Sequence, residues 1–451
     1  INLLDEAMEY VPKRGQRISN YEHTFCLEAL YALKAKTLLY AASPLFNGNA
    51  FYADFKNKNG ELLFNASYDR NKWLLAAEAA DKAVEICEGS DRALITGSTG
   101  KKTDLLNVMA DVENSMFSRF TNEEYLLEWK YTNTFHKFTL PRLVGDDKNF
   151  DAQAVGCLSP SMKMVEMYYT ENGLPIDADI TWNYSNRYKL GSESSPEYEG
   201  VIPMNTSVVN LHLRREPRFY ASIAGDRMYW QRGTNTAQDD YNLLVEAHKG
   251  EVPWGTQYDF IISNSWQNIN GYWLKKHLFS WFQTLGYSNN LQGNETAAII
   301  RLAEVYLMQS EAWNEYLDQP DSRVYDPIDK VRERAGILPV REAWGSYSNN
   351  PTKVTTKVGM REIIHQEYNI EFAFEGHRYW NLRRWLIAHQ ILNEKQYGWN
   401  VIGTTDQAFY NYETGPVVVW SSNKFVAPRD YLTPFDAEEI LISGMVQNPQ
   451  W

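Results

Sequence analysis

The chain has 451 residues, 44% of them hydrophobic and 14% aromatic, so it is long enough to bury a substantial core. Its 44 basic and 57 acidic side chains give a net charge of −13, which repels phosphate backbones and excludes sequence-independent binding to nucleic acid. Three widely spaced cysteines form neither a metal-binding pair nor a disulfide framework, and no apolar run approaches the roughly 20 residues that span a bilayer.

Two amphipathic helices are predicted near the N-terminus. The first lies within 21–42, ends at the sequence SPLFNG, and has an apolar face made of Leu27, Leu30, Tyr31, Leu38 and Ala41. The second follows Asp69, a suitable N-cap, and has a face made of Trp73, Ala76, Ala77, Ala80, Val84 and Cys87. Because many of these side chains are small, we expect the second helix to pack closely against a neighbour.

Helical patterns return near residue 295. The segment 295–317 has an apolar face made of Ile299, Leu302, Ala303, Tyr306 and Trp313, and a shorter helix is predicted at 326–335. The last long helix is predicted at 359–375, with Ile363, Ile370 and Phe374 on one face. Gly376 interrupts the pattern before it resumes at Tyr379, so we expect a bend or a break there.

Residues 131–290 lack this periodicity and are predicted to form loops and short strands around turn sequences such as ENGLP and NINGYW. Long irregular segments in a compact chain usually carry function. Tryptophan is modestly enriched between 181 and 290, at Trp182, Trp230, Trp254, Trp266, Trp273 and Trp281. This part of the chain is therefore the candidate ligand-facing region.

Nucleotide and calcium motifs are incomplete. GSTGKKT at 97–103 has Ile95 in place of the first glycine of a phosphate loop, which favours a surface turn. In DDKNFD, Asp147, Asn149 and Asp151 have the spacing of a calcium loop, but the following glycine and the final glutamate are missing. We expect no cofactor, and a structural calcium ion at this loop is an unsupported alternative.

No catalytic or transition-metal arrangement stands out. His365, His377 and His389 would be turned by about 120° from one another on a helix and cannot share a metal-binding face. The carboxylate pairs Asp177 with Asp179 and Glu438 with Glu439 are no stronger than chance among 57 acidic residues. No Ser, Cys or Thr lies in a GxSxG nucleophile motif, so we do not expect an enzyme.

The sequence EFAFEGHRYWNLRRW at 371–385 combines glutamates, arginines, a histidine and aromatic rings as an active site would. On a helix, Glu371 and Glu375 would lie one turn apart and repel each other unless a cation joined them. We therefore favour a structural ion-pair cluster in which Arg378 or another arginine bridges the two glutamates. The other members of this signature are Arg383 and Trp380, with Trp380, Phe372 and Phe374 packed around the charges.

Several long blocks occur in an order that is itself informative. They are ALYALKAKTLLYAASPLFNG (29–48), WLLAAEAADKAVEI (73–86), PSMKMVEMYYTENGLPI (160–176), RREPRFYASI (214–223), INGYWLKK (269–276), IRLAEVYLMQSEAWNE (300–315), VRERAGI (331–337), EFAFEGHRYWNLRRW and a C-terminal YLTPFDAEEI with QNPQW. Together they resemble the SusD-like (SusD/RagB) family of nutrient-binding outer-membrane lipoproteins. Tyr368 and Asn369, where the family often has arginines, depart from the pattern at scaffold positions.

The resemblance implies a mainly α fold, a tetratricopeptide-like scaffold of helix pairs with a long irregular loop and short-strand region inserted. It implies one SusD-like domain over 1–451, divided into a helical scaffold (1–130), a loop-rich ligand-facing region (131–290) and a C-terminal helical scaffold and tail (291–451). The family's lipoprotein signal, acylated cysteine and first helices are expected to be absent from this sequence. Location at the cell surface, lipid-anchored to the outer membrane, therefore follows from the resemblance alone.

The resemblance further implies a non-enzymatic protein that binds a glycan and delivers it to a SusC-like TonB-dependent transporter. Sugar rings present apolar faces to aromatic side chains, and their hydroxyls need polar neighbours, which TWNYSNRY (181–188) and PWGTQYD (253–259) interleave. The predicted ligand-binding residues are Trp182, Tyr184, Trp230, Trp254, Tyr258, Trp266, Trp273 and Trp281. Packing of these rings against the scaffold is the competing interpretation. Peptide binding, a role mainly as a transporter lid, and glycoside hydrolysis stay open as alternative functions.

Overall fold

The computed structural model describes residues 1–17, 24–118, 121–132, 136–139, 156–231, 242–250, 268–276 and 294–451. Its α-helices are α1 (Asn2–Met8), α2 (Leu27–Ala42), α3 (Asn71–Glu88), α4 (Asp104–Met116), α5 (His136–Thr139), α6 (Met162–Met167), α7 (Pro217–Ser222), α9 (Leu302–Tyr316), α10 (Ser322–Arg334), α11 (Val340–Tyr347), α12 (Lys357–Glu371), α13 (His377–Arg384), α14 (Ala388–Ile391), α15 (Asp406–Tyr410) and α16 (Ala437–Ser443). No helix in these ranges has the length and apolar character needed to cross a bilayer.

The strands are short and form small antiparallel sheets. They are β1 (Phe117–Ser118), β2 (Tyr125–Thr132), β3 (Leu190–Gly191), β4 (Val208–Val209), β5 (Ile223–Gly225), β6 (Tyr229–Trp230), β7 (Leu243–Leu244), β8 (Tyr272–Leu274), β9 (Asn294–Arg301), β10 (Gln396–Gly398) and β11 (Val417–Trp420). β9 lies between β1 and β2, and the other described strands pair as β3–β4, β5–β8, β6–β7 and β10–β11.

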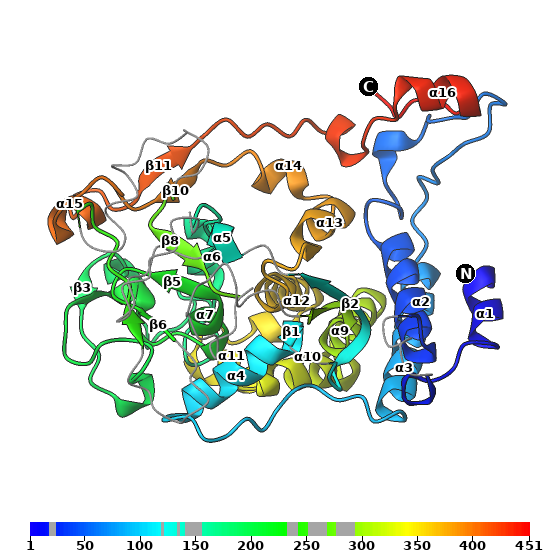
Figure 1. Cartoon of the computed structure of the whole chain (residues 1–451). Helices are drawn as coiled ribbons and strands as arrows, with labels where there is room; N and C mark the ends of the chain where they lie inside the picture. Colours follow the sequence, from blue (N-terminus) through cyan, green and yellow to red (C-terminus); the bar gives the residue numbers. More distant parts are fainter. Residues whose placement is uncertain are drawn as a thin grey trace.

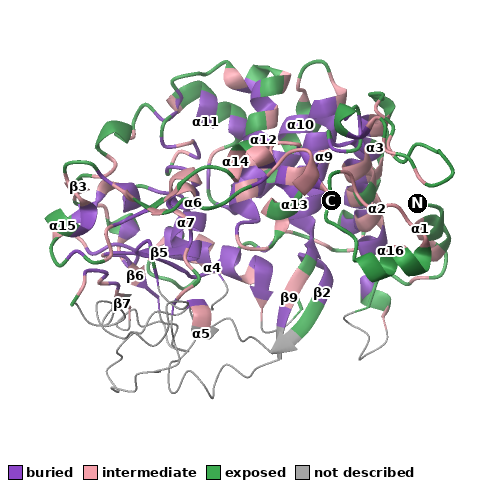
Figure 2. Cartoon of the chain, turned by 90° about the horizontal axis from the view of Figure 1, so that it is seen from above, coloured by how far each residue is buried: buried purple, intermediate pink, exposed green. Residues whose placement is uncertain are grey.

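Helix pairs form the scaffold, as the fold class predicted. α9 is central: it packs against α2, α3, α10 and α12, and α2 packs along α3 (Figure 1). Figure 2 shows buried residues concentrated along α9 and α10. A helix with neighbours on several sides is apolar on more than one face, and α9 accordingly buries most of its residues. The fold is mainly α, with a tetratricopeptide-like arrangement of helix pairs.

Alanines mark the contact between α2 and α3. The predicted apolar face of α3 is confirmed, since all six of its residues are buried. The predicted face of α2 is partly wrong, because Leu27, Tyr31, Leu38 and Ala41 are only half-buried. The fully buried row is instead Ala29, Ala32, Ala35, Leu39 and Ala42. Small side chains let the two helices approach closely, which leaves the larger apolar residues beside the contact.

The helix predicted from residue 295 begins later. Residues 294–301 form β9, which pairs antiparallel with β2 and places Ala297 opposite Trp129. Ile299, assigned to the helical face, is on the strand and 48% exposed. The helix α9 starts at Leu302, and its predicted face residues from Leu302 to Trp313 are buried. Pairing with a distant strand thus overrides the local helical pattern.

A second core fills the region that the sequence predicts as loops and short strands. It contains α6, α7 and strands β4, β5, β6 and β8, and aromatic residues such as Tyr168, Phe219 and Tyr272 lie within it. A smaller cluster joins α13 and α14 to the segment around Phe425 and Tyr431. α6 contacts β10, so the second core meets the C-terminal part of the chain at this point.

Candidate functional site

The charged block 371–385 does not form one helix. α12 ends at Glu371 and α13 begins at His377, so Glu375 lies in the connecting turn. Phe374 and Gly376 have φ angles of 67° and 83°, which reverse the chain direction there. The break predicted at Gly376 is confirmed, and Glu371 and Glu375 are not neighbours on a helical face.

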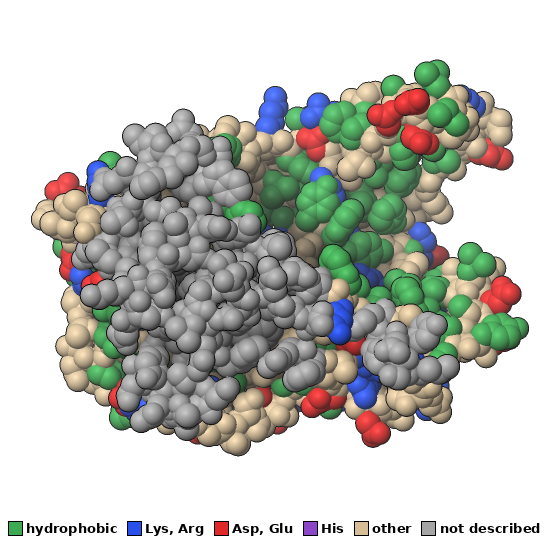
Figure 3. Space-filling view, viewed as in Figure 1, with side chains coloured by type: hydrophobic (Ala, Val, Ile, Leu, Met, Phe, Trp, Pro, Cys, Tyr) green, Lys and Arg blue, Asp and Glu red, His purple; other side chains and the backbone are tan. Residues whose placement is uncertain are grey.

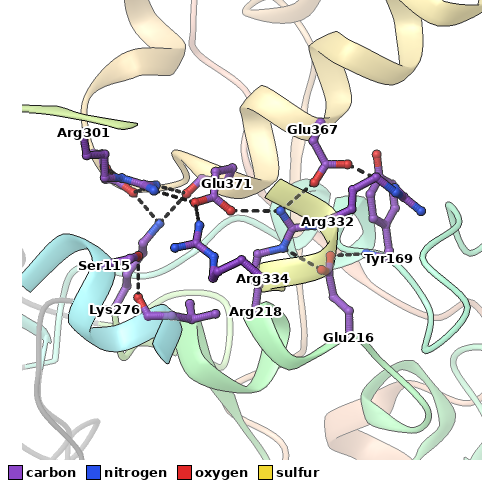
Figure 4. Close-up of polar contacts among 12 residues, drawn as sticks. Ser115, Tyr169, Glu216, Arg218, Lys276, Arg301, Arg332, Arg334, Glu367 and Glu371 are labelled. Atoms are coloured by element: carbon purple, nitrogen blue, oxygen red, sulfur yellow. Dashed lines mark hydrogen bonds and ion pairs between the residues drawn. The ribbon is translucent and has the colours of Figure 1, made fainter. Parts of the chain in front are cut away.

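Glu371 is the centre of a buried ion-pair network (Figure 4). Arg301 donates to its carboxylate at 2.6 Å and Arg218 at 3.0 Å, and Arg334 also donates to it. Burial alone would raise the pKa of Glu371, but Arg334, Arg301 and Arg218 outweigh that effect and hold the pKa well below its usual range.

Glu375 belongs to the same network. Lys276 donates to its carboxylate at 2.6 Å, and Arg301 donates to it at 2.9 and 3.0 Å. Burial would raise the pKa of Glu375, but Arg301 and Lys276 lower it to about 2. Arg301 therefore bridges Glu371 and Glu375, in the role that the sequence assigned to Arg378 or another arginine.

Three predicted members of the cluster lie elsewhere. Arg378 forms no ion pair or hydrogen bond with any residue of the described ranges. Trp380 is 56% exposed, so its predicted packing around the charges is wrong. The guanidinium of Arg383 stacks on the ring of Tyr379 at 3.7 Å and donates to the carbonyl of Asp430 at 3.2 Å. All three are on α13, beyond the turn that separates it from the network.

The predicted ligand-binding aromatics are divided between core and surface. Trp230 and Trp273 are 5% and 3% exposed and pack in the second core, where they offer no platform to a ligand. Trp182 is half-buried, and its indole Nε1 donates to the carbonyl of Leu213 at 3.1 Å. Tyr184 is 39% exposed and stacks with the guanidinium of Arg187 at 4.0 Å. Trp254, Tyr258, Trp266 and Trp281 lie outside the described residues.

The weaker motifs have structural roles or fall outside the described ranges. Thr103, the last residue of GSTGKKT, caps α4 by accepting from the Leu106 N–H at 3.2 Å. Asp179 is buried and accepts from the hydroxyl of Thr170 at 2.6 Å. The calcium-loop residues Asp147, Asn149 and Asp151 lie outside the described residues. Within the described part, no group of three His, Cys, Asp or Glu side chains is placed to hold a metal ion.

Two adjoining pockets form a groove where α6 meets α13, α14 and β10. The first, the α13 pocket, has a volume of about 360 Å³, and its lining includes Ser159, Pro160, Ser161, Lys163, Met164, Met167, Asn369, Ala373, Phe374, Gly376, Arg378, Tyr379, Ile391, Leu392 and Gln396. The second, the β10 pocket, has a volume of about 600 Å³, and its lining includes Met162, Lys163, Glu166, Tyr188, Glu394, Lys395, Gln396, Tyr397, Thr414 and Pro416. Both volumes suit small ligands. In the view of Figure 3, hydrophobic side chains gather over the region of α13 and α14.

Local hydrogen bonds hold the elements of the α13 pocket in place. The side chain of Ser161 caps α6 by accepting from the Met164 N–H at 3.2 Å. The carbonyl of Pro160, just before this cap, accepts from the Asn270 side chain at 2.6 Å. On the opposite side, the turn at Gly376 starts α13 and brings Arg378 and Tyr379 to the pocket.

The β10 pocket contains a chain of charged and aromatic groups. Glu166 accepts from Arg187 at 2.8 Å and from the hydroxyl of Tyr188 at 2.6 Å. Arg187 lies between the rings of Tyr184 and Tyr188, 4.0 and 4.2 Å from their centroids. The structure therefore connects the predicted residue Tyr184 to the groove through Arg187. Burial and the Glu166 carboxylate raise the pKa of Tyr188 far above its ordinary value.

The carboxylates of the β10 pocket both have cationic partners. Glu166 is ion-paired with Arg187, and Glu394 is ion-paired with Lys163. With Tyr397 and Tyr379 at 44% and 45% exposure, the groove offers aromatic rings beside hydrogen-bonding groups.

Sequence reasoning missed most of this groove. Tyr188 belongs to the segment TWNYSNRY, whose interleaved aromatic and polar residues did suggest a ligand surface. Arg378 and Tyr379 belong to a block that was interpreted as structural. Lys163 lies in the predicted ligand-facing region 131–290 but was not singled out as a binding residue. The available signal for Arg378 and Tyr379 was that they follow Gly376, a glycine that breaks a helix. Such a turn can direct the next side chains away from the core.

Comparisons with known proteins agree on one family. The model of the SusD family matches residues 116–451. SusD-like protein P25 of Formosa agariphila is 32% identical over 117 residues, covering 26% of this chain and 20% of the relative. SusD-like protein P2 of the same organism is 26% identical over 183 residues, covering 39% of this chain and 30% of the relative. The chain thus aligns with less than a third of each curated relative.

Solved structures share the fold over the whole chain. The protein BT4246 superposes with a TM-score of 0.79 at 24% identity, covering 100% of this chain and 75% of that one. A SusD-like carbohydrate binding protein of Bacteroides fragilis, BF0978, has a TM-score of 0.62 at 19% identity, covering 98% of this chain and 68% of that one. These similarities establish the fold.

Proposed function

Because this chain belongs to the SusD family, we propose that it binds an oligosaccharide in the groove formed by the α13 pocket and the β10 pocket, and that it does not cleave it. The observation that carries this proposal is the composition of the groove. Exposed tyrosine rings lie in it beside carboxylates, amides and cations. Sugars match such a surface, since their C–H faces stack on rings while their hydroxyls need hydrogen-bond partners.

The arrangement of the groove supports a saccharide over a purely apolar ligand. The two pockets share Lys163 and Gln396, so an extended chain of sugar units can occupy both. The Bacteroides fragilis protein BF0978, which shares this fold, is itself a carbohydrate binding protein. Tyr188 and Glu166 already form a fixed hydrogen-bonded pair, which lowers the entropy cost of presenting them to a ligand.

Absence of catalysis is part of the proposal. Both carboxylates in the described lining of the β10 pocket form ion pairs with cations, so each already has a partner other than a glycosidic bond. The function needs no cofactor, because recognition by stacking and hydrogen bonding requires neither a metal nor a redox group.

The wider role that we propose is delivery of the bound glycan to a SusC-like TonB-dependent transporter at the outer membrane. A lipid anchor would hold the protein at the cell surface. Both parts of this role rest on family membership.

Calorimetric titration with a panel of oligosaccharides, followed by product analysis after long incubation, tests the proposal. We expect saturable binding of at least one oligosaccharide and recovery of that ligand intact. Release of shorter sugars would contradict the non-catalytic role. A panel of peptides titrated in parallel serves as the control. If only peptides bind, the ligand of the groove is a peptide and not a saccharide.

A further inference from the structure

Arg378 lacks the carboxylate partner that several buried arginines of this fold have, and it also lacks the backbone carbonyls to which the buried Arg215 donates. Arg218, Arg301, Arg334 and Arg384 are buried, and each is ion-paired with at least one glutamate. Arg378 is half-buried, and its Nη1 atom is buried without a hydrogen-bond partner. Removing a guanidinium from water without a directly paired counter-ion is energetically unfavourable.

The carboxylate of Glu394 compensates the charge of Arg378 only in part. Burial lowers the pKa of Arg378, and the carboxylate of Glu394 offsets part of that effect. Glu394 forms its ion pair with Lys163 instead. The α13 pocket therefore contains a positive charge that has no ion-pair partner among the described residues, although the protein as a whole carries a net charge of −13.

Two further polar groups of the α13 pocket have unused hydrogen-bonding capacity. The side-chain Oδ1 of Asn369 and the hydroxyl of Ser159 are buried without a hydrogen-bond partner. Buried polar groups in proteins are nearly always satisfied, so several unsatisfied groups lining one pocket indicate a place for a polar occupant. The exposed ring of Tyr379, held by its stacking with Arg383, lies at the same pocket.

We infer that the α13 pocket receives an oxyanion substituent of the bound saccharide, a carboxylate or a sulfate ester, on the guanidinium of Arg378. A guanidinium matches both groups because its planar N–H donors can form paired, charge-assisted hydrogen bonds with two oxygens. Asn369 and Ser159 are then available for hydroxyls of the same sugar ring. The inference rests on the proposed function and adds to it the chemical class of the saccharide.

The negative net charge of the protein makes binding of an acidic saccharide depend on a local cation. Long-range electrostatics repel an acidic saccharide from the protein, so an acidic ligand gains affinity only through a local cation such as Arg378. A neutral saccharide of the same shape would leave the guanidinium unpaired in the complex, which costs affinity.

Two matched pairs of oligosaccharides test this inference by calorimetry. One pair is a galacturonate hexasaccharide and its carboxyl-reduced form, and the other is a sulfated galactan hexasaccharide and its desulfated form. We expect the intact protein to bind the acidic member of at least one pair about tenfold to a hundredfold more tightly than its neutral member. The pair that shows the preference identifies the substituent as carboxylate or sulfate.

The variant Arg378→Met should bind the acidic and the neutral member of that pair with equal affinity, because the substitution removes the cation that distinguishes them. Its melting temperature should be unchanged or higher, because the substitution removes an unpaired guanidinium. Arg323→Met is the matched control: Arg323 is on α10, pairs with Asp321 and lines neither pocket, so its loss changes the net charge equally. This control should retain the preference.

Each contrary result has a distinct meaning. Equal binding of both members of each pair, or a preference that survives in Arg378→Met, would overturn the oxyanion inference and leave the proposed function standing. A clear fall in the melting temperature of Arg378→Met would make Arg378 a scaffold residue and also overturn the inference. Failure of the intact protein to bind any of the four probes would count against the proposed function itself.

Discussion

Arg301 and Glu371, 70 residues apart in the sequence, form a buried ion pair in which the guanidinium Nη1 lies 2.6 Å from the carboxylate. Arg301 is the last residue of β9 and directly precedes α9, and Glu371 is the last residue of α12. The pair therefore joins two helices of the scaffold at their ends. Arg301 also holds Glu375 in the turn that leads to α13, which connects the scaffold to one wall of the groove.

Glu375→Gln should destabilise the fold without altering the site. The substitution leaves Lys276 and Arg301 with one fewer negative partner in a buried place, and breaking such a pair costs on the order of 3 kcal/mol. Chemical denaturation measures the loss, and Glu413→Gln, at an exposed position, is the control. Glycan affinity of the folded variant should be unchanged. Weaker binding with unchanged stability would instead make Glu375 part of the binding site.

Arg384 and Glu311 should behave as a coupled pair. Arg384 donates to both oxygens of Glu311, at 2.6 and 2.7 Å, and Trp385 donates to the same carboxylate at 2.9 Å. Arg384→Met alone should cost about 3–5 kcal/mol of unfolding free energy, because it leaves a buried carboxylate without its main partner. The double variant with Glu311→Gln should cost clearly less than the sum of the single variants. Additive losses would show that the two side chains act independently.

Stability should fall on acidification through protonation of Glu375. Its pKa is lowered from 4.5 to about 2 in the folded state, so folding favours the ionised form. The stabilisation is complete above pH about 4.5 and is lost as the pH falls toward 2, amounting to roughly 3 kcal/mol. Thermal melts of the wild type and Glu375→Gln between pH 6 and 2 measure it. The variant should show a shallower decline, and parallel curves would be contrary to this assignment.

Two glycine substitutions should separate backbone strain from steric overlap. Gly376 has a φ of 83°, and a Cβ there would meet no atom within 4 Å, so Gly376→Ala should cost only about 1 kcal/mol. Gly398 ends β10, and a Cβ there would lie 2.4 Å from Asn270 Cβ, so Gly398→Ala should cost about 1–3 kcal/mol. Denaturation of both variants under one condition compares them. A larger loss for Gly376→Ala would reverse this order.

The structural elements that were predicted correctly from the sequence are those that a local sequence pattern indicates. The buried face of α3 and the break at Gly376 followed from spacing and from a single glycine, and the structure has both. The strand β9 was predicted as helix because its partner β2 is more than 160 residues away in the chain, where no local pattern can indicate it. The order of the sequence blocks was sufficient to predict the family, because the blocks are spread along the whole chain.

The site was harder to predict for a related reason. Trp230 and Trp273 were predicted to bind ligand because tryptophans in loops are typical of a binding surface. They pack instead in a core formed by segments that are far apart in the sequence. Arg378 was assigned to the ion-pair cluster because its spacing from Glu375 fits a helix, but the chain turns between them. Tyr184 approaches the groove only through Arg187. The role of Trp254, Tyr258, Trp266 and Trp281 in binding stays a prediction.

The central claim is that the groove between α6, α13 and β10 binds an oligosaccharide, and the groove tyrosines test it most directly. The variant Tyr379→Ala/Tyr397→Ala removes one exposed ring from each pocket. The control Tyr10→Ala removes an exposed ring that follows α1 and lines neither pocket. Circular dichroism and melting temperature confirm that each variant is folded.

Calorimetric titration of these two variants and the wild type with the oligosaccharide that the wild type binds best is the deciding measurement. Loss of two ring–sugar contacts should weaken binding at least about tenfold in Tyr379→Ala/Tyr397→Ala, and Tyr10→Ala should bind as the wild type does. An unchanged affinity in the folded double variant would contradict the account and place the ligand elsewhere on the protein.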